Sequence, residues 1–125
     1  MLVDTDVLIW HLRGLPKATQ RLDEMPKLTI SAITYLELLQ GMRSKAETVA
    51  VQKSLELRHT ERLAITPAIT ERAVALMETL ALSSGLQLGD ALIAATALEH
   101  NLPLLTANTK HFAVIEGLKI ERFEP

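Results

Sequence analysis

The chain opens with Met1–Trp10, MLVDTDVLIW, in which two aspartates interrupt an otherwise apolar run. The apolar residues of Met1–Asp4 predict a short buried β-strand, and Asp6–Arg13 predicts the helix that follows it. A buried carboxylate is costly unless it changes its protonation or finds a partner. The simplest explanation is that Asp4 or Asp6 caps this helix by accepting its first backbone N–H groups.

The same alternation of short apolar runs and helical patterns continues along the chain. Further strands are predicted at Lys27–Ile30, Arg62–Thr66, Leu104–Thr106 and Leu118–Phe123. Further helices are predicted at Pro16–Met25, Ser31–Arg43, Lys45–Arg58, Pro67–Ser84 and Leu88–His100. Short apolar strands separated by helices are typical of a parallel sheet that is buried on both faces. We therefore expect one α/β domain over residues 1–125, with a mostly parallel sheet of about four to five strands.

Composition narrows the class of protein. Hydrophobic residues make up 48% of the 125 residues, which predicts a folded globular domain. The absence of cysteine excludes disulfides, thiolate metal sites and cysteine nucleophiles. No apolar run reaches the ~20 residues of a membrane span, and the early aspartates argue against a signal peptide, so we expect a soluble cytoplasmic protein. The net charge of −2 counts mildly against a nucleic-acid partner but permits a local basic rim.

Polar residues that follow the predicted strands are candidates for a functional site, because ligands of parallel α/β folds bind beyond the carboxyl ends of the strands. Glu37 lies on the polar strip of the helix after the second strand, and Asp90 lies in the first turn of a helix that is apolar almost all round. Asn108 follows the fourth strand, with Thr106 beside it. Each also has a simpler role available: Glu37 as a solvated glutamate, Asp90 as a helix-dipole partner, and Asn108 as a turn residue or the cap of a following short helix.

Together with Asp4, these residues predict three carboxylates and a Thr-x-Asn segment at one edge of the sheet. Like charges do not gather without a cation, and a site built only from oxygen ligands suits Mg²⁺ or Mn²⁺ rather than zinc. Such ions activate water and stabilise the departing oxygen of a phosphodiester. The four histidines have no metal-binding spacing, so they are interpreted as surface residues, and no Gly-rich phosphate loop is present.

Four segments stand in order along the chain: VDTDVLI (3–9), ITYLELLQG (33–41), LGDALIAATAL (88–98) and LLTANTKHF (104–112). In this order they resemble the PIN-domain ribonucleases, above all the toxins of VapBC toxin–antitoxin pairs, and the resemblance covers essentially the whole chain. It implies a three-layer α/β/α sandwich and an endoribonuclease that hydrolyses RNA with Mg²⁺ or Mn²⁺ and activated water. It further implies a homodimer and inhibition by a cognate antitoxin.

The resemblance also assigns the site residue by residue. The catalytic positions of the family fall on Asp4, Glu37, Asp90 and Asn108, of which the three acids are the expected metal ligands. Thr106 falls on the hydroxyl position of the Thr-x-Asp/Asn motif. The family often has Asp where this chain has Asn108, which removes one charge and puts a second metal ion in question. Asp6, at a position that is frequently Ser, Thr or Asn, adds a charge and is expected to support the site.

Two other functions remain open. A haloacid-dehalogenase-like phosphatase would use Asp4 as nucleophile and Asp6 as general acid, but that family also needs a late acidic pair, and TAN follows the fourth strand here. Alternatively, the chain keeps the PIN-like fold with an impaired site and binds RNA or protein without cleaving it. Asn108 and the net charge of −2 are the support for this second alternative.

Contacts with RNA and with an antitoxin are expected near the site. The basic residues that closely follow the site segments are the candidates for RNA contact: Arg13, Arg43, Lys45 and Lys110. Solvated surface charges are an equally good explanation for any one of them. The helices Ser31–Arg43 and Pro67–Ser84 are rich in apolar residues, which predicts an apolar groove for an antitoxin segment, although core or dimer contacts would also account for about half of them.

Overall fold

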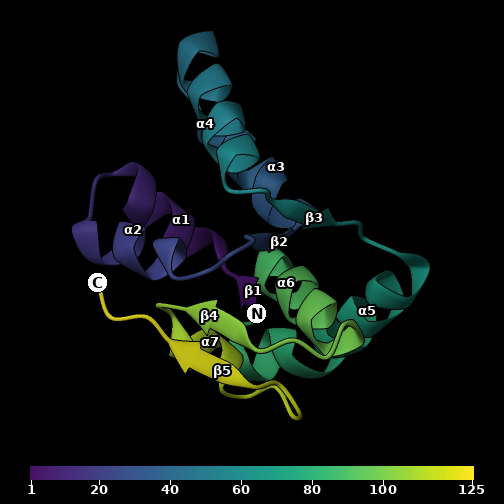
Figure 1. Ribbon diagram of the computed structural model, residues 1–125. Coiled ribbons are helices and arrows are strands. Elements are labelled where there is room, and N and C mark those ends of the chain that lie inside the picture. The colour runs from purple at the N-terminus through teal and green to yellow at the C-terminus, as the bar shows by residue number, and fades with distance from the viewer.

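The computed structural model describes all 125 residues, and its elements follow the predicted order (Figure 1). The strands are β1 (Leu2–Val3), β2 (Thr29–Ser31), β3 (Glu61–Leu63), β4 (Leu104–Thr106) and β5 (Ile120–Arg122). The helices are α1 (Thr5–Leu12), α2 (Pro16–Asp23), α3 (Ala32–Gln40), α4 (Lys45–Leu57), α5 (Pro67–Ser84), α6 (Leu88–Glu99) and α7 (Thr109–Phe112). All the predicted strands and helices are present, and α7 is the short helix that was one of the alternatives after Asn108.

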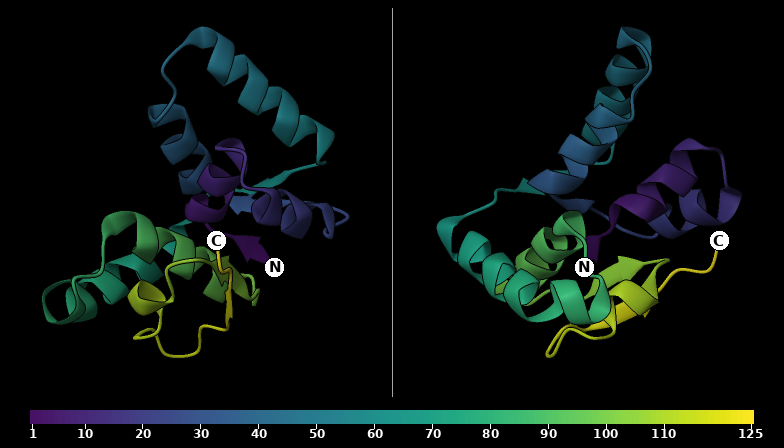
Figure 2. Two further views of the ribbon diagram at one scale, coloured as in Figure 1. Left: turned by 90° about the vertical axis from the view of Figure 1, so that its left-hand side faces the viewer. Right: turned by 180° about the vertical axis from the view of Figure 1, so that it is seen from behind.

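All strand pairs are parallel, as predicted. One ladder has the order β1-β4-β5, and β2 pairs with β3 in a second ladder. β2 lies beside β1 (Figures 1 and 2), although no ladder hydrogen bonds join these two strands. The predicted sheet of about four to five parallel strands is therefore confirmed, with an interruption between β1 and β2.

Alternate residues of the short strands point to opposite faces of the sheet, and both faces are covered. Leu2 and Leu104 belong to a core cluster with side chains of α5, α6 and α7. Val3 and Leu105 belong to a second cluster with side chains of α1, α2, α3 and α4. All four of these strand residues are fully buried. Helices on both faces of a parallel sheet confirm the three-layer α/β/α sandwich.

Local signals in the sequence account for most helix ends. The Ser31 hydroxyl accepts the Ile33 N–H at 3.2 Å and so caps α3, and the Thr66 hydroxyl accepts the Ile69 N–H at 3.2 Å and caps α5. α5 ends at Gly85, whose φ of 67° is left-handed and therefore favours glycine. Some boundaries differ by a few residues. β3 ends at Leu63 rather than at Thr66, because its partner β2 ends at Ser31, which pairs with Leu63.

The helix α4 extends away from the rest of the molecule and is reached through α3 (Figures 1 and 2). Val51 is its one buried residue, so most of its surface is open to solvent. α6 lies at the opposite extreme, with six buried residues among its twelve, as its almost entirely apolar sequence predicts. None of the helices combines the length and the apolar character that crossing a bilayer requires.

Candidate active site

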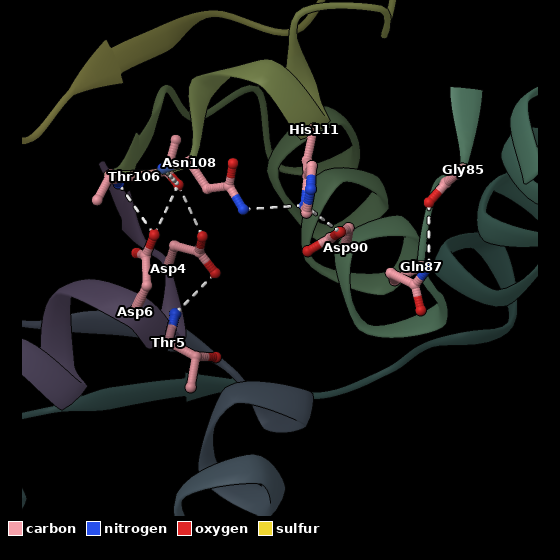
Figure 3. A network of polar contacts seen from close by, with 10 residues as sticks. Asp4, Thr5, Asp6, Gly85, Gln87, Asp90, Thr106, Asn108 and His111 are labelled. Atoms are coloured by element: carbon pink, nitrogen blue, oxygen red, sulfur yellow. Dashed lines mark hydrogen bonds and ion pairs between the residues drawn. The ribbon is translucent and has the colours of Figure 1, made fainter.

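The polar residues that follow β1 and β4 lie side by side at the edge of the sheet (Figure 3). β1 is the point at which strand order reverses, since β4 pairs with it on one side and β2 lies on the other. Ligands of parallel α/β proteins bind in the crevice at such a point. Side chains from α3 and from the first turn of α6 reach the same edge.

Asp4 is held by two donors although only 5% of its surface is exposed. Its Oδ1 accepts the Thr5 N–H at 2.8 Å, which is the capping role that the sequence left open, and its Oδ2 accepts the Thr106 hydroxyl at 2.7 Å. Burial, followed by the negative charge of Asp6, raises the pKa of Asp4 from 3.8 to about 7. The two hydrogen bonds oppose this shift without cancelling it.

Asp6 faces the same loop but is less completely bonded. Its Oδ2 accepts the Ala107 N–H at 3.1 Å and lies 3.3 Å from the Thr106 hydroxyl. Its Oδ1 is buried and has no hydrogen-bond partner at all. Burial raises the pKa of Asp6, and the hydrogen bond from Ala107 lowers it by less. The edge therefore holds two neighbouring carboxylates with too few donors to satisfy them.

Glu37 reaches this edge from α3. The Thr5 hydroxyl donates to its Oε1 at 2.7 Å, and the same hydroxyl lies 3.0 Å from that of the buried Thr34. Its other carboxylate oxygen lies against Gly89, the residue that precedes Asp90. Glu37 is therefore half-buried between the start of α1 and the start of α6. The simpler prediction of a fully solvated glutamate is wrong.

Asp90 lies in the first turn of α6 and is paired with a histidine. The Nδ1 atom of His111 is 3.2 Å from Asp90 Oδ2 and 2.9 Å from Asn108 Nδ2 (Figure 3). Burial raises the pKa of Asp90, and His111 opposes that shift. Asn108 itself is exposed, and its backbone N–H donates to the Thr106 hydroxyl oxygen at 2.9 Å. Its side chain faces His111.

The structure brings the three predicted acids to one edge of the domain. Thr5 links Glu37 to the segment that carries Asp4, and the charge of Asp90 contributes to the raised pKa of Asp4. No three acidic or histidine side chains lie close enough together to enclose a metal ion in this arrangement. Thr5, Thr106 and His111 hold the carboxylates individually instead.

Two residues of this network were not identified from the sequence. Thr5 stands between the two aspartates, and the alternating DTD pattern was the signal that could have drawn attention to it. His111 is exposed, as predicted for the histidines, but its contact with Asp90 was not predicted. It lies three residues after Asn108, on the single turn of α7, and it contacts Asp90 from there.

The chemistry of these side chains suits a divalent cation, although no three of them lie close enough together to enclose one in the present arrangement. The unpartnered Oδ1 of Asp6 is a buried oxygen without a donor, and burial raises the pKa values of Asp4, Asp6 and Asp90. A cation would stabilise the ionised form of each carboxylate and so offset these shifts. Carboxylate and other oxygen ligands are those that hard ions such as Mg²⁺ prefer. Its binding would replace part of the present hydrogen bonding.

A groove of about 590 Å³ begins at Glu37 and runs between α1, α3 and α4. Two of the four basic candidates, Arg13 and Arg43, line it, and Arg43 also pairs with Glu47 at 3.1 Å. Its apolar lining includes Ile9 and Leu12, which are 37% and 41% exposed. The remaining basic candidates are exposed outside this lining, Lys45 at the start of α4 and Lys110 on α7.

Comparisons with known proteins agree with this fold. A family model of the PIN domain matches residues 1–118. The chain is 41% identical over 123 residues to "Ribonuclease VapC10" of Mycobacterium tuberculosis. This match covers 95% of this chain and 90% of that protein. It is similar to a toxin–antitoxin complex from Klebsiella pneumoniae with a TM-score of 0.82 and 35% identity, covering 99% and 98% of the two chains. A DNA-bound VapBC from Salmonella typhimurium has a TM-score of 0.83 at 24% identity, covering 97% and 96%, which is a likeness of fold alone.

Proposed function

The chain belongs to the PIN domain family, and on that premise we propose that it is a metal-dependent endoribonuclease that acts as the toxin of a toxin–antitoxin pair. One observation carries the enzymatic part of this proposal. Three aspartates with raised pKa values lie with Glu37 at the strand-order reversal of a PIN fold. The relative that is 41% identical is named a ribonuclease, which supports RNA as the substrate.

The proposed ligands of the ion, Mg²⁺ or Mn²⁺, are Asp4, Glu37 and Asp90, with Asp6 as a further negative charge. When bound, a divalent cation supplies the Lewis acidity that activates water and stabilises charge on the phosphodiester. The chain's own polar groups orient the ligands: the Thr106 hydroxyl holds Asp4, and the Thr5 hydroxyl holds Glu37. Asn108 takes the fourth catalytic position, where it adds no charge.

The two alternative functions have less support. The phosphatase would require a different family, whereas the match to the PIN domain covers residues 1–118. The segment after β4 also carries Ala107 and Asn108 where the phosphatase would need acids. An impaired binding module has the support of Asn108 and of the net charge of −2, but the other three predicted catalytic positions have carboxylates and Asp6 adds another. We therefore favour the enzyme.

RNA cleavage by the purified protein tests the enzymatic proposal. We expect cleavage of a structured RNA with Mg²⁺ or Mn²⁺, none with a chelator, and none by Asp4→Asn or Asp90→Asn in either condition. Asp23→Asn is the matched control, because Asp23 is an exposed aspartate that pairs with Arg58 outside the site. Cleavage at the full rate in chelator would contradict the role of the metal.

The toxin assignment implies an antitoxin partner and places the protein in the cytoplasm with its RNA substrate. The groove between α1, α3 and α4 supports binding of such a partner, because it offers exposed apolar side chains and ends at the carboxylate of Glu37. An arginine of the antitoxin would be suited to these carboxylates through bidentate hydrogen bonds. Half of the ten apolar residues of α5 instead pack in the core, and no residue of α5 lines this groove, to which α3 contributes.

Co-expression with the protein encoded beside this chain tests the partner. The two should co-purify, and the complex should not cleave RNA until the partner is removed. A neighbour that neither binds nor inhibits would contradict the toxin assignment and leave the nuclease assignment standing. We also propose a homodimer, which the exposed Leu36, Val74, Leu82 and Leu88 support, and sedimentation of the isolated chain should detect it.

A further inference from the structure

Gly89 is a glycine inside a helix, where this residue is unfavourable. It lies in the first turn of α6, and glycine in a helix destabilises by roughly 0.5–1 kcal/mol relative to alanine. Its backbone is not left-handed: among the glycines, positive φ values occur at Gly14, Gly85 and Gly117 only. Conformational freedom therefore does not explain Gly89.

Space does explain it. A Cβ atom at Gly89 would lie 2.8 Å from Oε2 and 3.5 Å from Cδ of Glu37. Van der Waals contact does not permit the shorter of these distances, so the Glu37 carboxylate would have to move. That carboxylate ends a flexible side chain, so the carboxylate rather than the backbone would move. The fold can therefore tolerate a side chain at Gly89. The Glu37 carboxylate, however, cannot keep its present position beside such a side chain.

The position that would be lost is a defined one. Glu37 Oε1 is fixed by the Thr5 hydroxyl at 2.7 Å, and its Oε2 rests against Gly89, one residue before Asp90. The residue that caps α6, Gln87, makes no side-chain hydrogen bond to the first turn. A carboxylate beside the N-terminus of a helix is stabilised by the partial positive charge there. The Glu37 carboxylate thus lies against the first turn of α6, at the residue that precedes Asp90.

We propose that Gly89 is a positioning residue of the site: the absence of a side chain lets the Glu37 carboxylate lie against the first turn of α6, beside Asp90 and linked through Thr5 to the Asp4 segment. The proposal rests on the proposed metal-dependent function. Gly89 touches neither the metal nor the RNA, and it acts only through Glu37.

Mn²⁺ binding to metal-stripped protein, measured by calorimetric titration, tests this role. Gly89→Ala should weaken Mn²⁺ binding by about 10-fold or more, as is typical when a group that orients a ligand is lost. The Tm of the metal-free variant should be unchanged or higher, because alanine is the better helix former. Gly41→Ala is the matched control, since a Cβ there would meet only carbonyl oxygens at 3.6 and 3.7 Å, which are ordinary contacts. It should bind Mn²⁺ as the wild type does.

A second background separates positioning from a general structural effect. In Glu37→Ala protein, the added methyl group of Gly89→Ala has no carboxylate to displace, so it should cause no further loss of Mn²⁺ affinity. Equal losses in both backgrounds, or wild-type affinity in Gly89→Ala alone, would overturn the proposal. A Tm that falls equally when Gly89→Ala is introduced into the wild type and into Glu37→Ala protein would likewise assign Gly89 to packing rather than to positioning.

A crystal structure of metal-free Gly89→Ala distinguishes failure of this inference from failure of the proposed function. The Glu37 carboxylate should leave its place and lose the hydrogen bond to Thr5. If the wild type binds no Mn²⁺ at all, the metal-dependent function is wrong, and this structure then decides the positioning by itself. A Glu37 carboxylate that keeps its place beside Ala at this position overturns the inference.

Discussion

Thr106 has one hydroxyl proton and two carboxylates within reach. Its oxygen is 2.7 Å from Asp4 Oδ2 and 3.3 Å from Asp6 Oδ2, and it also accepts the Asn108 N–H. A single proton satisfies one acceptor well, so Asp4 has the stronger bond and Asp6 keeps an unpartnered Oδ1. At the scale of single residues, the site is therefore short of positive charge and of donors.

Replacing Asp4 by its neutral isostere should separate folding from metal binding. At pH 8 we expect Asp4→Asn to be more stable than the metal-free wild type by more than about 1 kcal/mol, because the buried ionised carboxylate, whose pKa is about 7, is removed. Addition of Mn²⁺ should stabilise the wild type and leave the variant unchanged. Urea unfolding with and without chelator measures both effects.

The matched control for this prediction is Asp23→Asn, which removes an exposed aspartate and its ion pair with Arg58. Its stability should change by less than about 1 kcal/mol, the usual range for exposed pairs. If Asp4→Asn is less stable than the wild type, the prediction is wrong. The carboxylate would then stabilise the protein more as a helix cap than it destabilises it as a buried charge.

His11 gives the stability of the protein a separate pH dependence. Burial and the nearby charge of Arg58 lower the pKa of this histidine, whose Nδ1 lies 2.7 Å from the Thr19 hydroxyl. The unfolded chain therefore takes up the proton first, at about pH 6.5. The stability that neutral His11 contributes is present above that pH and is lost as the pH falls through its lower folded-state value.

Stability measured by urea unfolding should thus decrease more steeply below pH 6.5 for the wild type than for His11→Gln. His100→Gln, at an exposed histidine that follows α6, should retain the wild-type slope. Parallel pH profiles for the wild type and His11→Gln would remove His11 as the cause.

The sequence predicts those site residues whose position follows from chain order alone. Asp4, Asp6 and Thr106 follow β1 or form the end of β4, and the parallel pairing of these strands brings them together. Thr5 and His111 were missed because their roles depend on helix rotation and on side-chain reach across segments distant in sequence. The pattern of residue types along the chain predicts neither how a helix is rotated nor how far a side chain reaches.

At the scale of elements, caps fix the start of the longest helix. Thr66→Ala should destabilise the protein by about 1 kcal/mol, because the Ile69 N–H loses the hydroxyl oxygen that accepts it at 3.2 Å. Thr70→Ala is the control: this exposed hydroxyl donates to the Thr66 carbonyl within the helix, and alanine is a better helix former. Urea midpoints of both variants measure the difference, and equal midpoints would show that the cap contributes nothing.

Element boundaries were less predictable than the elements themselves. Helix starts at Ser31 and Thr66 and the end at Gly85 are encoded locally, by side chains that cap or by a glycine that turns left-handed. Strand ends are set by the partner strand: Ala64 to Thr66 extend beyond the pairing of Ser31 with Leu63 and so lie outside the ladder. The end of a strand therefore depends on two segments of the chain, and the sequence of one segment does not predict it.

At the scale of the whole molecule, the small negative net charge leaves room for basic residues beside the acidic site. The formal charge is −2, yet Arg13 and Arg43 line the groove that begins at the acidic site. If these residues contact RNA phosphates, each substitution to alanine should weaken RNA binding and reduce the slope of log affinity against log salt by about 0.7–0.9. Arg72→Ala, on α5, where the side chain pairs with Glu99, should leave the slope unchanged. Fluorescence anisotropy across a salt series measures these slopes.

The overall architecture was predictable because short apolar strands separated by helices allow few arrangements. The resemblance to PIN ribonucleases added the three layers and the site positions. The groove was not predictable in its place, because it is formed by α1, α3 and α4 together, whereas the sequence pattern indicated α5 as well. Apolar richness alone does not distinguish a helix face in the core from one that is open.

The missing ladder between β1 and β2 divides the molecule into two parts that differ in how they are joined. β1, β4 and β5 share backbone hydrogen bonds. β2, β3 and α4 are joined to the rest of the molecule through side-chain packing, which includes the contact between the hydroxyls of Ser31 and of Thr96 on α6. We expect the second part to open as a separate cooperative unit, so that deuterium replaces the amide protons of β2 and β3 sooner than those of β4. Hydrogen-exchange protection of single amides in the metal-free protein should give two different free energies of opening. A single common value would mean that side-chain packing joins the two parts as firmly as ladder hydrogen bonds would.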